Sequence, residues 1–171
     1  YLNRLFLWSS LKTKIKLIDS ESITKDNVEE KLKGIDAVVV PGGFGKRGIE
    51  GKIETINYVR KTKIPFLGIC LGMQLAVVEY ARNVLGLTNS NSAELDKTTK
   101  DPVIHIMEEQ KEVTKKGGTM RLGAYPCILK EGTRAKEVYG EKEISERHRH
   151  RYEFNNSYRQ DLEKAGLIVS G

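Results

Sequence analysis

The stretch that decides the fold is Pro65-Phe66-Leu67-Gly68-Ile69-Cys70-Leu71-Gly72-Met73-Gln74. Its first half is a short apolar run, which predicts a buried strand over 65–69. Apolar residues then recur at helical spacing, at Leu75, Val78, Ala81 and Leu85. A strand that runs directly into a helix places Cys70 on a sharp turn between two glycines, which is the cysteine form of a nucleophile elbow. The glycines are needed because a Cβ on either side of so tight a turn would clash.

The segments around this turn alternate between strand and helix. Strands are expected at 14–19, 37–40, 65–69, 102–107, 121–129 and 167–169, an extended segment at 144–154, and helices at 24–34, 49–59, 75–85 and 157–165. The polar segment 89–92 and the charged segment 108–118 are expected to be loops. Strand and helix in this order predict an α/β fold with an open, mainly parallel sheet that carries helices on both faces.

Composition narrows the class of protein. The chain has 171 residues, which suits a single domain, and its net charge is +6. Lysines interleave with glutamates, so we expect a mixed solvated surface, with no nucleic-acid or membrane partner. The two cysteines make no disulfide framework and indicate a reducing cytoplasm, and no Cys/His spacing indicates a metal. The chain does not begin with Met, so we expect it to be a piece of a longer polypeptide.

The turn at Cys70 predicts nucleophilic chemistry. The following helix points its amino end at the sulfur and favours the reactive thiolate. Attack on a carbonyl builds negative charge on oxygen, and hydrogen-bond donors have to meet it. We expect the backbone N–H of Leu71 to be one donor and the loop 41–45 (Pro-Gly-Gly-Phe-Gly) to supply another. The alternative is a buried cysteine whose glycines serve only close packing.

Two motifs together carry a family resemblance. Pro41-Gly42-Gly43 combined with 68–74 resembles class I (triad-type) glutamine amidotransferases. The segments 43–51, 117–123 and 146–153 (Glu-Arg-His-Arg-His-Arg-Tyr-Glu) narrow the resemblance to the CTP synthase family. It extends from about Ile15 to Gly171. It implies a flavodoxin-like α/β fold and one amidotransferase domain over 1–171, with its C-terminal end incomplete and the N-terminal synthetase domain absent.

The resemblance implies a role for each residue of the site. Cys70 is the expected nucleophile, and Gly43 and Leu71 supply backbone contacts. Gln74 and Glu94 are expected to bind the amino-acid end of glutamine. The remaining substrate contacts are expected from Gly72, Met73 and Arg151, with Phe44 against the substrate and Arg47, Thr119 and Arg121 in segments associated with GTP activation.

A cysteine amidase also needs a base and a residue that orients it. The family takes both from a His-Pro-Glu motif, which the 171 residues do not contain. His105 is expected to be structural, and His148 and His150 match the 146–153 segment instead of the catalytic histidine. We therefore expect this polypeptide alone to have little glutaminase activity.

The implied reaction is hydrolysis of glutamine to glutamate, with the ammonia used for ATP-dependent amination of UTP to CTP. No cofactor is expected in this domain, with Mg²⁺ and ATP bound by the synthetase domain of the same polypeptide and GTP as allosteric effector. The family also implies a homo-oligomer, a tetramer, in the cytoplasm. The alternatives are another elbow-cysteine hydrolase of the same superfamily and a non-catalytic regulatory fragment.

Overall fold

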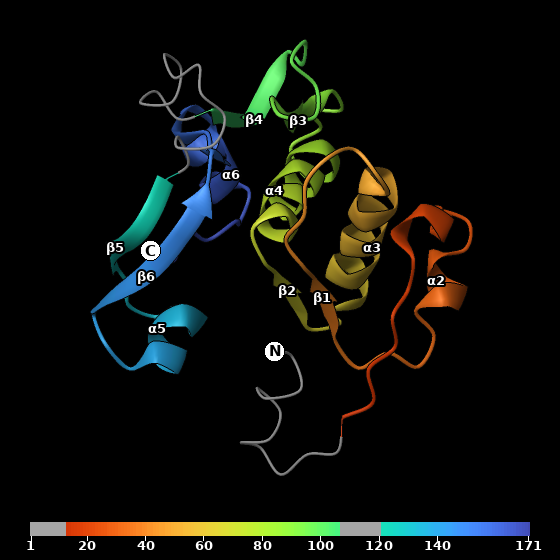
Figure 1. Ribbon diagram of the computed structural model, residues 1–171, viewed down its shortest axis with the longest axis horizontal. Coiled ribbons are helices and arrows are strands. Elements are labelled where there is room, and N and C mark those ends of the chain that lie inside the picture. The colour runs from red at the N-terminus through yellow and green to blue at the C-terminus, as the bar shows by residue number, and fades with distance from the viewer. Residues whose placement is uncertain (1–12, 107–120) are drawn as a thin grey trace.

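Figure 1 shows the computed structural model of the chain, which describes residues 13–106 and 121–171 but not the side chains of residues 121 and 122. The elements in chain order are η1 (Ser20–Ser22), α2 (Val28–Lys31), β1 (Val38–Val40), α3 (Ile49–Thr62), β2 (Phe66–Gly68), α4 (Leu71–Asn83), β3 (Ser90–Ser92), β4 (Asp101–Ile106), β5 (Arg121–Ile128), α5 (Arg134–Tyr139), β6 (Glu143–His150), β7 (Tyr152–Phe154), η3 (Asn156–Tyr158) and α6 (Arg159–Lys164). The expected helices are confirmed, that at 24–34 as a short α2 and that at 157–165 as η3 followed by α6.

β1 and β2 form the parallel pair that carries the elbow. Val38, Val39 and Val40 lie opposite Phe66, Leu67 and Gly68 in register. The helix α4 leaves directly from the end of β2, and α3 packs against α4 (Figure 1). This is the strand, helix, strand, helix order that the sequence predicts.

The strands of the described residues fall into three sheets rather than one. β3 pairs with β4 in parallel, β4 pairs with β7 antiparallel, and β5 and β6 form a separate antiparallel pair. In Figure 1 the β5–β6 pair and α5 stand to one side of the helices α3 and α4. The α/β class is confirmed, with antiparallel pairs beside the parallel ones.

Three expectations for individual segments are wrong. Residues 14–19 have no strand, and Leu17 is 93% exposed. The segment 167–169 is also not a strand. Conversely, the expected loop at 89–92 contains β3, whose Ser90 and Ser92 are buried against their neighbours. The expected loop at 108–118 lies outside the described residues.

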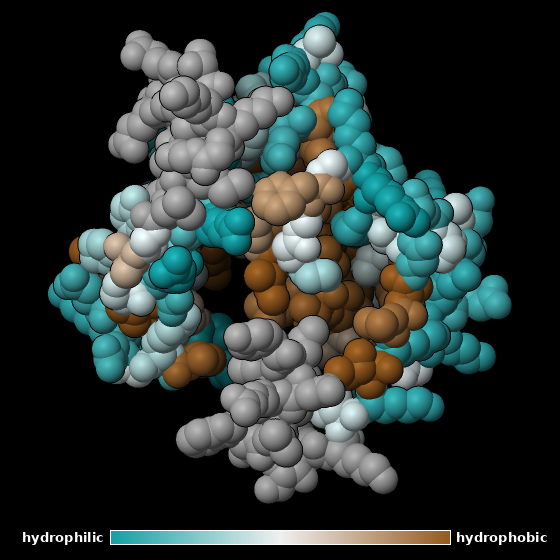
Figure 2. Space-filling model, in the orientation of Figure 1, coloured by the Kyte–Doolittle hydropathy of each residue, from teal (hydrophilic) through white to brown (hydrophobic). Residues whose placement is uncertain are grey.

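The main core lies between α3, α4 and the strands. It is built from buried aliphatic residues of these elements, among them Ile53, Ile56, Leu75, Val78 and Ile104. Leu67 and Ile69 lie on the outside of this core and are 56% and 47% exposed. Figure 2 shows hydrophobic surface in the middle of the molecule, where Figure 1 places β1 and β2.

Candidate active site

Cys70 lies at the junction between β2 and α4, as predicted. Its backbone has φ 52° and ψ −105°, a conformation that residues with a side chain rarely adopt. Ile69 N donates to the carbonyl of Val40 at 2.9 Å, and Gln74 N donates to the carbonyl of Cys70 at 3.0 Å, so strand bonding ends and helix bonding begins at this residue. The side chain of Cys70 is exposed. The sulfur is therefore presented to solvent on a rigid turn.

The two glycines of the turn are required by close packing. A Cβ on Gly68 would lie 2.6 Å from the backbone carbon of Gly72, and a Cβ on Gly72 would lie 2.1 Å from the carbonyl oxygen of Val40. Both distances are shorter than atoms tolerate, and both neighbours are backbone. Gly72, which the resemblance assigns to the substrate, thus has a clear structural role as well, because it lets α4 approach β1.

The glycine loop after β1 lies beside the nucleophile. A Cβ on Gly42 would be 3.4 Å from the Cβ of Cys70, and a Cβ on Gly43 would be 3.4 Å from Cδ2 of Leu71. Leu71 opens α4, so its N–H belongs to the first turn, whose amides have no partner within the helix. The loop and the start of α4 therefore lie beside Cys70, close enough for their backbones to serve as an oxyanion hole. Gly42, which lies against Cys70, was not singled out by the sequence, because the sequence marks the loop but not which of its glycines packs beside the cysteine.

Gln74, Glu94 and Arg151 come from separate parts of the chain. Gln74 is 5% exposed, and its Nε2 donates to the carbonyl of Tyr152 at 3.0 Å. Burial raises the pKa of Glu94, and the positive charge of Arg151 opposes that rise. Tyr152 follows Arg151 directly, so the backbone next to Arg151 is bonded to α4. Tyr152 itself was missed, because a backbone acceptor leaves no signal in the sequence.

The other predicted residues are placed as follows. Met73 and Phe44 are exposed, at 42% and 72%. Arg47 Nε donates to Glu21 Oε2 at 2.7 Å, and this bond raises the pKa of Arg47. Thr119 lies outside the described residues, as does the side chain of Arg121.

The three histidines lie on β4 and β6, not on β1 or β2 beside the elbow. His105 lies on β4 opposite Glu153 of β7. His148 Nδ1 and His150 Nε2 lie 2.9 Å apart on β6, and the Tyr125 and His148 rings make an edge contact. His105 therefore lies within a strand, where the sequence placed it, and the other two histidines lie on β6.

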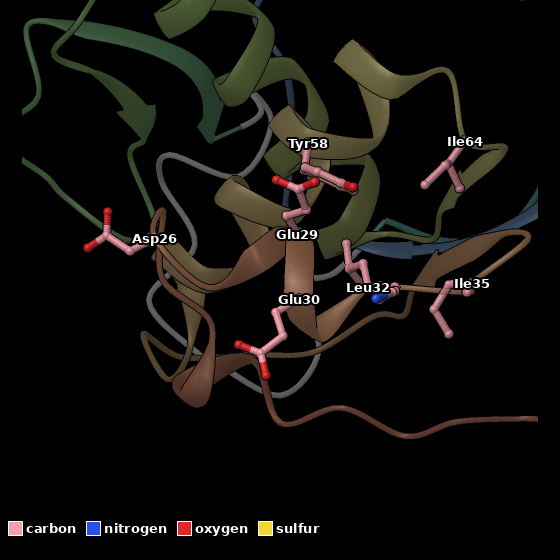
Figure 3. A pocket seen from close by; sticks show the side chains of 9 residues that line it. Asp26, Glu29, Glu30, Leu32, Ile35, Tyr58 and Ile64 are labelled. Carbon is pink, nitrogen blue, oxygen red and sulfur yellow. The ribbon is translucent and has the colours of Figure 1, made fainter.

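A hollow beside α2 lies on the other side of α3 from α4 (Figures 1 and 3). Its lining combines three acidic residues and one lysine with apolar and aromatic ones, namely Asp26, Glu29, Glu30, Leu32, Lys33, Gly34, Ile35, Tyr58 and Ile64. No thiol or imidazole is among these lining residues. The hollow is therefore not part of the arrangement around Cys70.

The part of the chain that the structure describes contains no group of three or more metal-ligating side chains, and none of its helices is long and apolar enough to cross a membrane.

The sequence as a whole matches a known family. The family model described as "Glutamine amidotransferase class-I" matches residues 7–171. The chain belongs to the class I glutamine amidotransferases. The fold class is that of this family.

Individual relatives of this amidotransferase chain are named CTP synthase. That of Halalkalibacterium halodurans is 60% identical over 157 residues, 92% of this chain and 30% of the relative. That of Bacillus subtilis is 56% identical over 158 residues, again 92% of this chain and 30% of the relative. The solved structure of the Trypanosoma brucei CTPS glutaminase domain with bound acivicin has a TM-score of 0.91 and 38% identity, and the match covers 98% of this chain and 65% of that one. The chain thus spans about 30% of the length of these curated relatives.

Proposed function

We propose that the chain is the glutamine-hydrolysing domain of a CTP synthase. The observation that carries the proposal is Cys70, exposed on a strained elbow, with Gly42 and Gly43 of the neighbouring loop packed beside Cys70 and Leu71. The relatives named CTP synthase support the choice of this enzyme within the family.

The residues divide the chemistry between them. Cys70 attacks the side-chain amide of glutamine and forms a thioester, and ammonia leaves. The N–H of Leu71 and the backbone of the 42–43 loop stabilise the oxyanion. Glu94 receives the ammonium group of the substrate and Arg151 its carboxylate, because each carries the complementary charge. Water then releases glutamate from Cys70.

We propose that the base for this reaction comes from another part of the complete protein. Among the described residues the three histidines belong to β4 and β6, and the 171 residues contain no His-Pro-Glu. We therefore propose that the chain becomes fully active only as part of the complete gene product, in which ammonia passes to a synthetase domain that binds ATP and Mg²⁺ and aminates UTP. An oligomer, a tetramer by family resemblance, belongs to the same proposal.

Two further parts of the proposal concern regulation and location. GTP is the expected effector, and Arg47, whose Nε is paired with Glu21 at 2.7 Å, is an expected partner of its phosphates. Both cysteines are free thiols, which supports a reducing cytoplasm.

The proposal is tested by assaying the complete gene product for two products, glutamate from glutamine and CTP from UTP, ATP and glutamine. The Cys70→Ser variant is expected to lose both glutamine-dependent reactions and to keep CTP formation from added ammonia. Loss of ammonia-dependent synthesis as well would mean that Cys70 serves the fold rather than glutamine hydrolysis. Turnover of the isolated 171-residue chain close to that of the complete protein would contradict the proposed need for an outside base.

A further inference from the structure

The loop 41–48 joins β1 to α3 and carries the glycines that pack beside the elbow (Figure 1). Its first end is fixed by β1, where Val40 is buried and its carbonyl accepts a hydrogen bond from the N–H of Ile69 at 2.9 Å. Residues 41–47 are all exposed, so the main core does not hold the middle of the loop. The position of the loop therefore depends on how its second end is held at the start of α3.

The second end of the loop is closely packed against η1. Gly48 lies in the left-handed region, at φ 62°, and a Cβ there would lie 2.1 Å from Oγ of Ser20. One turn into α3, a Cβ on Gly51 would lie 1.8 Å from the carbonyl oxygen of Ser20. Because no side chain fits into so small a space, both glycines are needed for η1 to lie this close to the start of α3.

An ion pair between Arg47 and Glu21 joins the same two segments, with Nε and Oε2 at 2.7 Å. The two side chains are 78% and 46% exposed, and pairs as exposed as this contribute little because water screens them. The contact at Ser20 is stronger evidence of a fixed position, since it involves backbone atoms and the buried Gly51. Ile23, the residue after η1, is itself buried among residues of α2 and α3. Ser20 is thus held in place where it meets the end of the loop.

We propose that Ser20 is a positioning residue for the glycine loop. By fixing the start of α3 it fixes the second end of the loop, and so holds the backbone N–H groups beside Cys70 where the oxyanion forms. Donors that are already in place stabilise a transition state more than donors that have first to be ordered. This inference rests on the proposed glutaminase function and adds to it a residue of η1, outside the elbow and the loop.

The test compares two variants of the complete gene product by kcat and KM for glutamine. Gly51→Ala adds a Cβ that displaces the backbone of Ser20, while α3 itself is not weakened, because alanine favours a helix more than glycine does. Ser20→Gly removes the side chain that meets Gly48. We expect kcat to fall about tenfold in Gly51→Ala and about threefold in Ser20→Gly, with KM within about twofold, because an oxyanion hole acts on the transition state alone.

Alkylation of Cys70 by iodoacetamide separates an effect on the loop from an effect on the elbow. In this reaction the thiolate forms a bond to carbon and iodide leaves, so no oxyanion develops. Mass spectrometry of the Cys70 peptide is expected to show both variants alkylated within about twofold of the wild-type rate. Alkylation slowed as strongly as kcat would overturn the proposal, because the change would then have reached the sulfur itself.

Leu32→Ala is the matched control, because it removes buried apolar contacts from the cluster that contains Ile23 without adding an atom at the start of α3. It is expected to lower the melting temperature and to leave kcat within about twofold. A loss of kcat as large as that of Gly51→Ala would overturn the proposal in favour of a general loss of stability.

An unchanged kcat in both Gly51→Ala and Ser20→Gly would overturn the proposal too. If Gly51→Ala does not fold, Ser20→Gly alone decides, since it only shortens an exposed segment's side chain. A wild-type protein that hydrolyses no glutamine would instead defeat the proposed function, and that outcome is read before any variant is compared.

Discussion

The backbone of Cys70 has φ 52° and ψ −105°, so the residue with the reactive sulfur is also strained. Conformations of this kind cost about 1–3 kcal/mol and persist where the surrounding structure holds them. Here the surroundings are β2, α4 and the two glycines on either side. The strain is the consequence of turning the chain from strand to helix within one residue.

The strain predicts an unusual order of stability among variants. Cys70→Gly is expected to be more stable than Cys70→Ala by about 1 kcal/mol, because only glycine enters positive φ without a steric cost. Chemical denaturation of the two variants measures the difference. Equal stabilities, or a more stable alanine variant, would show that the backbone at residue 70 relaxes in solution.

The close packing of Gly72 leads to a second prediction for a single residue, a loss of stability when a Cβ is added. Gly72→Ala is expected to lower the free energy of unfolding by about 3 kcal/mol, because the added Cβ would lie 2.1 Å from the carbonyl oxygen of Val40. Gly43→Ala is the control, since its Cβ would meet Leu71 at an ordinary 3.4 Å. Similar losses in both variants would contradict the packing argument.

Glu94 predicts a pH dependence. Burial raises its pKa and Arg151 opposes the rise, so Arg151→Met is expected to raise that pKa further. Since the folded-state pKa exceeds the unfolded value, ionised Glu94 weakens stability above the folded pKa, and stability recovers as the pH falls towards the unfolded pKa. Carbon-13 NMR titration of the Glu94 carboxyl in both proteins measures the direction. A pKa that falls in Arg151→Met would contradict the proposed contact.

At the scale of elements, α4 connects much of the molecule. Cys70 precedes it, Gln74 bonds β7, Tyr80 bonds the end of α6, and Glu79 bonds α3. Glu79 is 1% exposed, and its carboxylate accepts hydrogen bonds from Nε and Nη2 of Arg60 and from Asn83. The helix that positions the nucleophile is therefore held at several points along its length.

The pair between α3 and α4 predicts an asymmetric loss of stability. Arg60→Met is expected to destabilise the fold by about 3–5 kcal/mol, because it leaves the buried carboxylate of Glu79 without its cation. Glu79→Gln should cost less, since Arg60 is 30% exposed and can be hydrated. Arg134→Met breaks an exposed pair with Glu137 and is expected to cost under about 1 kcal/mol. Urea denaturation ranks the three variants, and an Arg60→Met loss no larger than that of Arg134→Met would refute the argument.

The elements differ in how well the sequence predicts them. β1, β2 and α4 are predictable because apolar period and glycine placement coincide there. The segment 14–19 mixes apolar residues with lysines, and among the described residues no strand pairs with it. Its sequence could not show that a pairing strand is absent. β3 was missed because Ser90 and Ser92 are polar, although both are buried beside β4. α5 was missed despite a visible signal, since Thr133 caps its start and Gly140 ends it in the left-handed conformation.

Some features of the site can also be predicted from the sequence and others cannot. The positions of Cys70 and of the glycine loop can be predicted, because each depends only on a strand end and the turn that follows it. The link from Gln74 through Tyr152 to Arg151 joins residues 78 positions apart and uses a backbone carbonyl, so only the structure reveals it. The same holds for Gly72, whose packing against Val40 depends on how two strands pair.

In the molecule as a whole, we expect one of the two free thiols to be a catalytic group and the other not. Cys70 is exposed on the elbow, and Cys127 lies half-buried on β5. The two sulfurs differ in surroundings and belong to different parts of the fold, since β5 pairs with β6 and not with the strands of the elbow. Cys127 can therefore serve as an internal reference: a reagent that reacts with any thiol can modify both cysteines, whereas one that needs the glutamine site is expected to modify Cys70 alone.

Whether Cys70 is the nucleophile of a glutamine site can be tested by mass-spectrometric mapping of cysteine adducts after the complete gene product is treated with acivicin, with and without glutamine. Within residues 1–171 we expect a single adduct, on Cys70, whose formation glutamine slows, and none on Cys127. Iodoacetamide labelling of unfolded protein serves as the control that both peptides are detected. Equal modification of both cysteines, or modification of Cys70 that glutamine does not slow, would contradict the assignment of Cys70 as that nucleophile.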